Sequence, residues 1–446
     1  MNSTHDVFHS ILHITHNDSD AIGCALIEEL LYPKEVMEYK NLVVVEAGAS
    51  YADKVIITEL LGLELSFMKS IKEFYESKDL ESKKFLFIRE LIETHFSEGK
   101  LKYDFLLISD HNISEEMAYF LDYLKRDLLV YMDQSTNPIT FDLMLFDHHD
   151  SARDLEKYSW VYMPPYVLNE GFRNVSACHL MYTKMNMIGK YSPITLHSAS
   201  MMVNVSDVNQ MGLSMSEMQS LWKVILLISY YDTFSYKEEK ELYEKMLSDN
   251  FPIGTNYSAD YVSNALEIYE FQKVLDDLVS WYKENIRYIN HSDSFPSIER
   301  DMKHSFSDGK IFPPDIEFIN EKVVKEIKFK NYLDIYRKAR VIKFVFEGFL
   351  YDCVVFISCR GDYVSEEMYE LIHSNEKIHM GIIIFPESME ISLRSDGTVN
   401  VSEIAVSLGG GGHVKASGFH ANKETIMFLM ATYYSGEFLW KYNQNN

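Results

Sequence analysis

The chain has 446 residues, enough for two to three domains, and it carries 67 acidic against 42 basic side chains, a formal net charge of −25 at pH 7. This excess of acid disfavours a protein that coats long nucleic acid through a broad basic face, because such binding depends on Lys and Arg neutralising phosphates. No apolar run approaches the length of a membrane span, and no basic region followed by an apolar core opens the chain, so we expect a cytoplasmic protein without a membrane segment. The four cysteines are scattered without a C-x-x-C pair, which indicates neither a zinc knuckle nor a disulfide framework.

The first part of the chain alternates between strand-like and helix-like patterns. Short apolar runs predict strands at 11–15, 42–47, 104–109, 128–132 and 142–146. Apolar residues recurring at three and four predict helices at about 20–31, within 54–98, and at 114–124, where Ser114 is the expected N-cap. This alternation favours an α/β fold with a mostly parallel sheet covered by helices on both faces.

The rest of the chain changes character twice. A helix is predicted over 218–232, and the segment 236–335 is helical and polar, with one long candidate helix at 258–289. From about 341 strand patterns return, and they lead to four consecutive glycines before His413. We therefore predict three parts: 1–235 with a helical insertion at about 50–100, a helical connector at 236–335, and a smaller α/β domain at 336–446.

Residues 322–343 gather eight Lys and Arg side chains in an otherwise acidic protein. A solvated helix face is the favoured interpretation of such a run, and a local basic wall facing a phosphate backbone is the sharper alternative.

Asp and His residues follow three of the predicted strands at the points where the strands end. These residues are His16, Asp18 and Asp20 after the first, Asp110 after the third, and Asp147, His148 and His149 after the fifth. Asp232 ends the apolar run VILLISYYD and is a further candidate. In open α/β sheets ligands bind outside the carboxyl ends of the strands, so we expect these side chains to converge on one crevice.

Imidazoles combined with several carboxylates suit Mn²⁺ and related divalent ions better than a thiolate site would. Converging carboxylates repel one another unless cations bridge them, and two ions about 3.5–4 Å apart would form a phosphoryl-transfer site. Taken alone, Asp18 favours a helix cap, and the pair His148 and His149 decides little. The histidines at 5, 9, 13, 291 and 304 are interpreted as ordinary surface or core residues.

Four motifs resemble, in order, the signatures of the DHH phosphoesterase superfamily: HNDSD, the Asp of LLISD, the DHH triplet of LFDHHDS and the Asp of SYYD. The stretch SLRSDGTVNVSEIAVSLGGGGHVKASGF (392–419) resembles the glycine-rich signature of the DHH-associated substrate domain. The form of the first motif is most similar to that of the NrnB-type oligoribonucleases (nanoRNases). Family members commonly have Gly where this chain has Ala21, which requires a negative φ at that position.

The resemblance implies a set of roles. One metal would be held by His16, Asp18 and Asp110, and the second by Asp20, Asp110, His148 and Asp232, so that Asp110 bridges them. Asp147 would orient His148, and His149 would face the scissile phosphate or assist the leaving group. In the associated domain, Arg394 would grip a phosphate, and the turn Gly409, Gly410, Gly411, Gly412 and His413 would bring backbone N–H groups close to it.

The expected activity is two-metal hydrolysis of short single-stranded RNA or dinucleotides to mononucleotides, with Mn²⁺ as the favoured ion and Mg²⁺ or Co²⁺ as alternatives. Duplex binding is not expected, and a homodimer is compatible with this interpretation. The alternatives are a 3′-phosphoadenosine 5′-phosphate type phosphatase, a cyclic-dinucleotide phosphodiesterase and a RecJ-like exonuclease. An inorganic pyrophosphatase ranks lower because that branch lacks the GGGGH signature, and a non-catalytic nucleotide-sequestering protein ranks last because the ligand positions are all filled.

Overall fold

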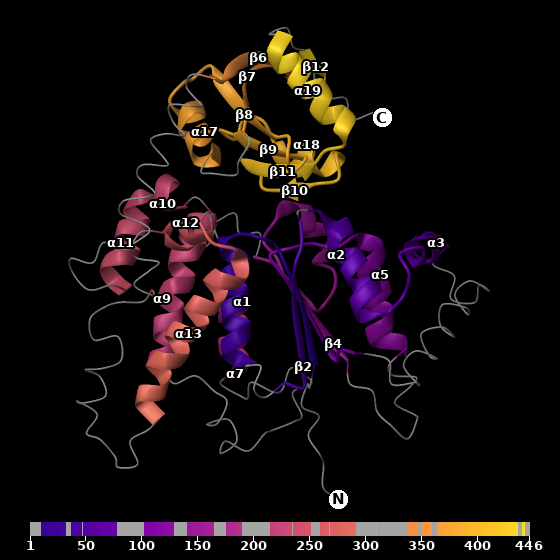
Figure 1. Ribbon diagram of the computed structural model, residues 1–446, viewed down its shortest axis with the longest axis vertical. Coiled ribbons are helices and arrows are strands. Elements are labelled where there is room, and N and C mark those ends of the chain that lie inside the picture. The colour runs from indigo at the N-terminus through magenta and orange to yellow at the C-terminus, as the bar shows by residue number, and fades with distance from the viewer. Residues whose placement is uncertain are drawn as a thin grey trace, which may run out of the picture. The chain divides into compact units, whose positions relative to one another are not determined.

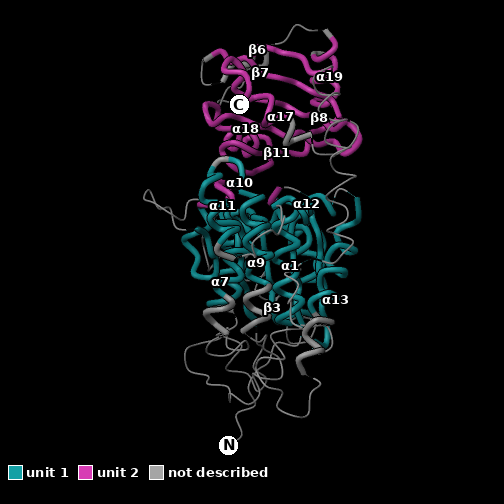
Figure 2. Tube along the Cα trace, turned by 90° about the vertical axis from the view of Figure 1, so that its left-hand side faces the viewer, with its two compact units in different colours: residues 1–46, 50–148, 154–317 teal, residues 47–49, 149–153, 318–446 magenta. Residues whose placement is uncertain are grey.

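The computed structural model describes residues 10–32, 37–46, 48–77, 102–128, 141–164, 175–189, 215–233, 235–250, 259–266, 268–290, 312, 338–346, 349–358, 364–435 and 439–441. The chain forms two compact units, which Figure 2 shows in different colours. The first comprises residues 1–46, 50–148 and 154–317, and the second 47–49, 149–153 and 318–446.

The first unit contains a five-stranded sheet and the helices around it. Its strands are β1 (Ser10–Thr15), β2 (Tyr39–Val44), β3 (Phe105–Ser109), β4 (Asp142–Phe146) and β5 (Val161–Tyr162). Its α-helices are α1 (Ser19–Leu31), α2 (Ala49–Val55), α3 (Phe67–Ser77), α5 (Glu115–Tyr123), α7 (Ala177–Gly189), α9 (Met215–Asp232), α10 (Ser235–Glu238), α11 (Lys240–Asn250), α12 (Tyr261–Leu266) and α13 (Phe271–Asn290). Two π-helical turns (Ile56–Leu60 and Leu124–Leu128) also belong to it, and a 3₁₀ turn (Asp150–Leu155) includes residues of both units.

The sheet has the order β2-β1-β3-β4-β5, and every pair in it is parallel. Every residue of β3 and β4 is buried, as expected for parallel strands that are covered on both faces. The chain reverses its direction of winding between β1 and β3, because β2 lies on one side of β1 and β3 on the other. Such a switch point opens a crevice at the carboxyl ends of the two strands.

Helices cover the sheet on both faces, as predicted (Figure 1). On one face α1 packs against α7, α9 and α13, and this layer supplies most of the main core. On the other face lie α2, α3 and α5, with α5 beginning at the predicted cap Ser114, whose hydroxyl accepts from the Met117 N–H at 3.2 Å. Gly23 allows the close approach of α1 and α7, since a Cβ there would lie 2.8 Å from Cys178 Cβ.

The helices of the predicted connector are part of the first unit as far as residue 317. The long helix predicted at 258–289 is wrong: the structure has two helices, α12 and α13. In a continuous helix Ile268 would lie on the same face as the buried Ala265, three residues earlier. The break instead leaves Ile268 38% exposed and buries Phe271 at the start of α13.

The second unit is built on a seven-stranded mixed sheet of order β10-β11-β9-β8-β7-β6-β12. Its strands are β6 (Arg340–Phe346), β7 (Phe349–Ile357), β8 (Ile378–Phe385), β9 (Glu390–Ser395), β10 (Gly411–Gly412), β11 (Ala416–His420) and β12 (Leu439–Lys441). Its helices are α17 (Val364–His373), α18 (Val401–Ser407) and α19 (Lys423–Ser435). The strands expected from residue 341 onward are therefore present, and apolar side chains of the sheet, α18 and α19 form a core of their own.

Several sequence predictions fall outside the described residues. They are most of the basic stretch 322–343, the strand 128–132 beyond Leu128, and the second half of the 50–100 insertion. Of the four cysteines, Cys24, Cys178 and Cys353 are described, and all three are free and buried. No helix in the described ranges is both long enough and apolar enough to cross a bilayer.

Candidate metal centre

The loop after β1 carries three of the predicted ligands at alternate positions. Asp18 is the N-cap of α1, and its Oδ1 accepts from the Ala21 N–H at 2.9 Å. Its other oxygen lies 2.9 Å from His16 Nδ1. Ala21 lies inside α1 and is not among the residues with positive φ. Its backbone therefore has the negative φ that an Ala at this position requires.

Asp20 lies in the first turn of α1 and is fully buried. Its two oxygens accept from the N–H groups of Ala177 at 2.7 Å and Cys178 at 3.0 Å, at the start of α7. A helix N-terminus presents unsatisfied N–H groups and a partial positive charge, which makes it a favourable place for a carboxylate. Burial nevertheless raises the pKa of Asp20 to about 6, and the neighbouring Asp18 charge adds to this effect.

Asp110 follows β3 and is 1% exposed. Its φ of 50° is unusual for a residue with a Cβ. Its N–H donates to the Phe146 carbonyl at 2.8 Å, which fixes the end of β3 against the end of β4. Burial raises the pKa of Asp110 well above its ordinary value, and the charges of Asp18, Asp20 and Asp232 raise it further.

The His148 ring lies close to three of the predicted carboxylate ligands. Its Nε2 lies 3.2 Å from Asp232 Oδ2, 3.4 Å from Asp110 Oδ1 and 3.6 Å from Asp20 Oδ2. Asp232, at the end of α9, is therefore brought to the strand ends from a helix. Asp147 contacts the backbone of its neighbour, since Oδ1 accepts from the His148 N–H at 2.7 Å, and its carboxylate also lies within 4.8 Å of that of Asp110.

The predicted ligands thus form two neighbouring groups. His16, Asp18 and Asp110 each offer an atom within 4.8 Å of the others, and so do Asp20, His148 and Asp232. These donors are imidazole nitrogens and carboxylate oxygens, which suit a divalent cation of the Mn²⁺ or Mg²⁺ type. The charges of three carboxylates raise the pKa of Asp110, and a cation bound among these oxygens would relieve that repulsion. The residues therefore fit a metal site.

In the second unit, Arg394 lies on β9 between β8 and β11. Its Nη1 donates to Ser392 Oγ at 2.8 Å and to the Leu393 carbonyl at 2.9 Å. These bonds hold the guanidinium close to its own strand. A guanidinium has five N–H donors in a planar fork, a geometry that suits a phosphate.

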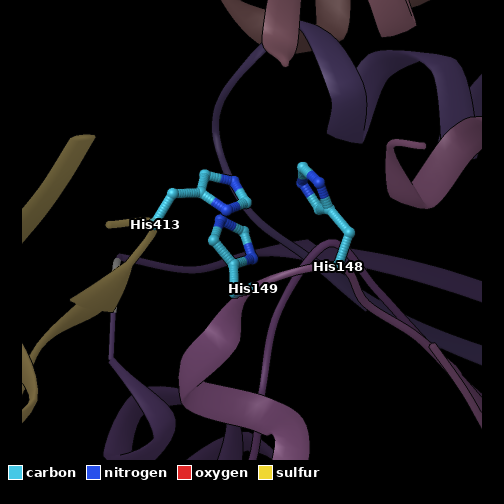
Figure 3. A group of neighbouring side chains, drawn as sticks. All are labelled: His148, His149 and His413. Carbon is cyan, nitrogen blue, oxygen red and sulfur yellow. The ribbon is translucent and has the colours of Figure 1, made fainter. Parts of the chain in front are cut away.

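The backbone of the predicted glycine turn requires glycine at several positions. Gly409 and Gly412 have φ of 83° and 131°, and a Cβ at Gly410 would meet the Gly418 carbonyl oxygen at 2.0 Å. His413, which follows Gly412, begins a tight turn. The His413 carbonyl closes this turn by accepting a hydrogen bond from Ser417 Oγ at 2.6 Å. Its ring stacks on that of His149, another residue of the second unit, with centroids 4.6 Å apart; Figure 3 shows this pair together with His148.

Two groups of contacts were missed by the sequence interpretation. The Ala177 and Cys178 amides that hold Asp20 are backbone groups, so no side-chain pattern in the sequence predicts these contacts. His111 directly follows Asp110, is 4% exposed and lies with its ring centroid 6.2 Å from that of His16. Burial lowers the pKa of His111. Its position directly after a candidate ligand was the one available signal.

No family model and no curated protein matches the chain. Among solved structures, the chain is similar to a manganese-bound RecJ exonuclease at 11% identity and a TM-score of 0.42, over 96% of this chain and 89% of that one. It is also similar to the pGpG-specific phosphodiesterase PggH from Vibrio cholerae, at 9% identity and a TM-score of 0.34, over 96% and 98%. A third match is an uncharacterized protein from Helicobacter pylori G27, at 15% identity and a TM-score of 0.29, over 96% and 100%.

Proposed function

We propose that this chain is a phosphoesterase of the DHH type that hydrolyses short single-stranded oligoribonucleotides or dinucleotides to mononucleotides with the help of two divalent cations, Mn²⁺ being favoured. The observation that carries the proposal is the pair of donor groups at the carboxyl edge of the parallel sheet, His16 with Asp18 and Asp110, and Asp20 with His148 and Asp232. They belong to four motifs that together span more than 200 residues of sequence, and they lie at the switch point, where such sheets bind ligands.

The first group would hold one ion and the second the other, with Asp110 placed to contribute to both. When bound, the ions would neutralise charge on the phosphate and stabilise the charge that develops as its ester bond breaks.

The chain's own side chains prepare this site. Asp18 hydrogen-bonds His16 and the α7 amides fix Asp20, so both ligands are oriented before a substrate arrives. In the proposal His149 binds a phosphate oxygen or gives a proton to the leaving oxygen, and Arg394 grips a second phosphate.

The substrate class is argued from charge and from the glycine turn. With a net charge of −25, long or duplex nucleic acid has little basic surface to follow. Gly409 and Gly412 occupy backbone conformations in which L side chains are strained, and a chain without Cβ atoms can approach a phosphate closely. A short substrate with few phosphates fits both features.

The test is a turnover panel with Mn²⁺ on the purified protein. End-labelled RNA of two to five nucleotides is compared with a long single strand, a cyclic dinucleotide and 3′-phosphoadenosine 5′-phosphate. Release of mononucleotides from the shortest RNAs alone is the expected result. Turnover of one other substrate alone would assign the protein to that branch, and metal binding without any turnover would favour nucleotide sequestration.

Asp110→Ala should abolish turnover, because it removes the carboxylate that lies between the two donor groups. The matched control is Asp276→Ala, which removes an exposed carboxylate of α13 that pairs with Gln272 on the same helix. An active Asp110→Ala protein would contradict the two-metal proposal.

A further inference from the structure

A second buried polar cluster lies between α1 and the sheet, and it contains none of the predicted metal ligands. His13, on β1, is fully buried, and its Nδ1 lies 3.7 Å from Glu28 Oε2 on α1. The other Glu28 oxygen lies 2.7 Å from Lys40 Nζ on β2, and Lys40 also contacts Glu29 at 3.2 Å. Burial raises the pKa of Glu28, but the charge of Lys40 and the contact with His13 lower it more, so that its pKa is below the ordinary value.

This cluster continues toward the metal centre. Asp20, Cys24 and Glu28 follow one another at intervals of four residues and therefore lie along one face of α1. All three are fully buried. Below them on the sheet, His13 Nε2 lies 2.7 Å from Ser109 Oγ, the side chain that immediately precedes Asp110.

Ser109 is held from two sides. The parallel register pairs it with Thr15, whose Oγ1 donates to the Ser109 carbonyl at 2.9 Å and lies 3.0 Å from Ser109 Oγ. The Ser109 carbonyl belongs to the peptide that leads into Asp110. The Thr15 hydroxyl thus fixes that peptide plane, directly before a residue whose φ is 50°.

The hydroxyl of Ser109 therefore lies between two side chains of β1. Thr15 gives its one hydroxyl hydrogen to the Ser109 carbonyl, and its Oγ1 also lies 3.0 Å from Ser109 Oγ. On the other side, His13 Nε2 lies 2.7 Å from the same Ser109 Oγ. Glu28 Oε2 lies 3.7 Å from the other ring nitrogen of His13, Nδ1.

Fold stability does not explain the cluster well. Burying a His, two Glu and a Lys costs desolvation free energy, and apolar residues of similar volume often replace buried ion pairs without loss of stability. An unusual backbone conformation such as that of Asp110 persists only where its surroundings determine it, and such residues concentrate at functional sites.

We propose that His13, oriented by Glu28 and Lys40, is a positioning residue that acts through Ser109 and Thr15 to hold Asp110 in its metal-binding conformation. The inference rests on the proposed function, because it concerns the metal ligand Asp110. In this proposal His13 contacts neither substrate nor metal.

The test measures Mn²⁺ affinity by calorimetry and the melting temperature of the metal-free protein, for the full chain and its variants. His13→Leu removes the hydrogen-bond partner of Ser109 Oγ at nearly constant volume, and we expect the Kd for Mn²⁺ to rise about 10-fold or more. His13→Gln retains an amide donor and should keep the Kd within about 3-fold of the wild-type value.

A second variant keeps the test sharp if His13→Leu does not fold. Thr15→Val removes the hydroxyl that fixes the Ser109 carbonyl and should also raise the Kd for Mn²⁺. Adding Ser109→Ala to His13→Leu should cause no further loss, because both changes interrupt the same chain of bonds. His379→Leu is the matched control, since His379 is hydrogen-bonded to a carboxylate, Asp396, in the second unit.

Wild-type Mn²⁺ affinity in both His13→Leu and Thr15→Val would overturn the positioning role and leave the proposed function intact. A lower melting temperature of metal-free His13→Leu with unchanged affinity would likewise assign His13 to the fold alone. A wild-type protein that binds no Mn²⁺ would overturn the proposed function, and the inference with it.

Discussion

At the scale of single residues, Asp18 shows that a structural and a functional role need not exclude each other. Its Oδ1 caps α1, as expected for an Asp at this position, while its Oδ2 holds His16. A carboxylate has several lone pairs, so one oxygen can satisfy the helix and the other can face the site. Asp20 is different, because both of its oxygens accept from backbone amides of α7.

Asp53, on α2, provides a prediction about pH. It is 1% exposed, burial raises its pKa to about 7, and its Oδ1 accepts from the Ser114 N–H at 3.1 Å. The folded state therefore keeps a proton that the unfolded chain loses at about pH 4, and its contribution to stability is lost as the pH rises toward 7. We expect Asp53→Asn to match the wild-type protein at pH 4 and to be more stable above pH 7, by at most about 4 kcal/mol.

Denaturant unfolding of both proteins at pH 4, 6 and 8 measures this difference. The Asn side chain keeps an oxygen that can accept from Ser114, so the comparison isolates the charge. A difference that is constant with pH would show that Asp53 is ionised in the folded protein at all three values.

At the scale of elements, α1 joins the core to the site. Asp18 is its N-cap, and its first turn carries Asp20. Its middle packs on α7, and the later Glu28 belongs to the cluster around His13. The N-terminus of α7 supplies the amides that hold Asp20, so the packing of these two helices determines the position of a candidate ligand. Gly23, at the contact between them, allows the backbones of α1 and α7 to approach closely.

We predict that Gly23→Ala destabilises the protein, although Ala is the better helix former by about 1 kcal/mol. The added Cβ would lie 2.8 Å from Cys178 Cβ and 2.9 Å from its Sγ, and overpacking of this kind costs about 1–3 kcal/mol. Displacement of α7 would also loosen the hold on Asp20 and weaken Mn²⁺ binding.

Thermal melting and calorimetry measure the two effects. Cys178→Gly removes both contacting atoms, so Gly23→Ala should cost less in that background than in the wild-type background. An equal cost in the two backgrounds would show that this contact is not the cause.

At the scale of the whole molecule, the candidate metal donors belong to the first unit and the predicted phosphate-binding side chain Arg394 to the second. Each unit has its own sheet and its own apolar core. In the proposed function the first unit therefore binds the metal ions, and the second unit binds the substrate phosphate.

This division predicts the behaviour of Arg394→Ala. A charge-assisted hydrogen bond to phosphate is worth about 1.5–3 kcal/mol, so we expect KM for a short RNA to rise about 10- to 100-fold. The Kd for Mn²⁺ should not change, because the ligands belong to the other unit. Steady-state kinetics and calorimetry separate the two quantities, with Lys377→Ala, an exposed cation of the second unit, as the control. A parallel loss of Mn²⁺ affinity would contradict the division.

The sequence by itself determined the fold class and indicated the candidate residues of the site. Buried-type apolar runs that alternate with helical periods require a covered parallel sheet, and Asp or His residues directly after parallel strands must meet at one edge. The structure brings His16, Asp18 and Asp110 into one group and places His148 Nε2 3.4 Å from Asp110 Oδ1. Local patterns also located Ser114 as a helix cap, since capping depends on neighbouring residues alone.

Tertiary structure decided what depends on packing between distant segments. The break between α12 and α13 follows from which side chains fit the core, and a periodic sequence does not show it. The amides that hold Asp20 come from residues more than 150 positions away, and they are backbone groups that every sequence has. His13 was one of the histidines interpreted as ordinary surface or core residues; its contacts with Glu28 and Ser109 exist only because β1, α1 and β3 lie side by side in the fold.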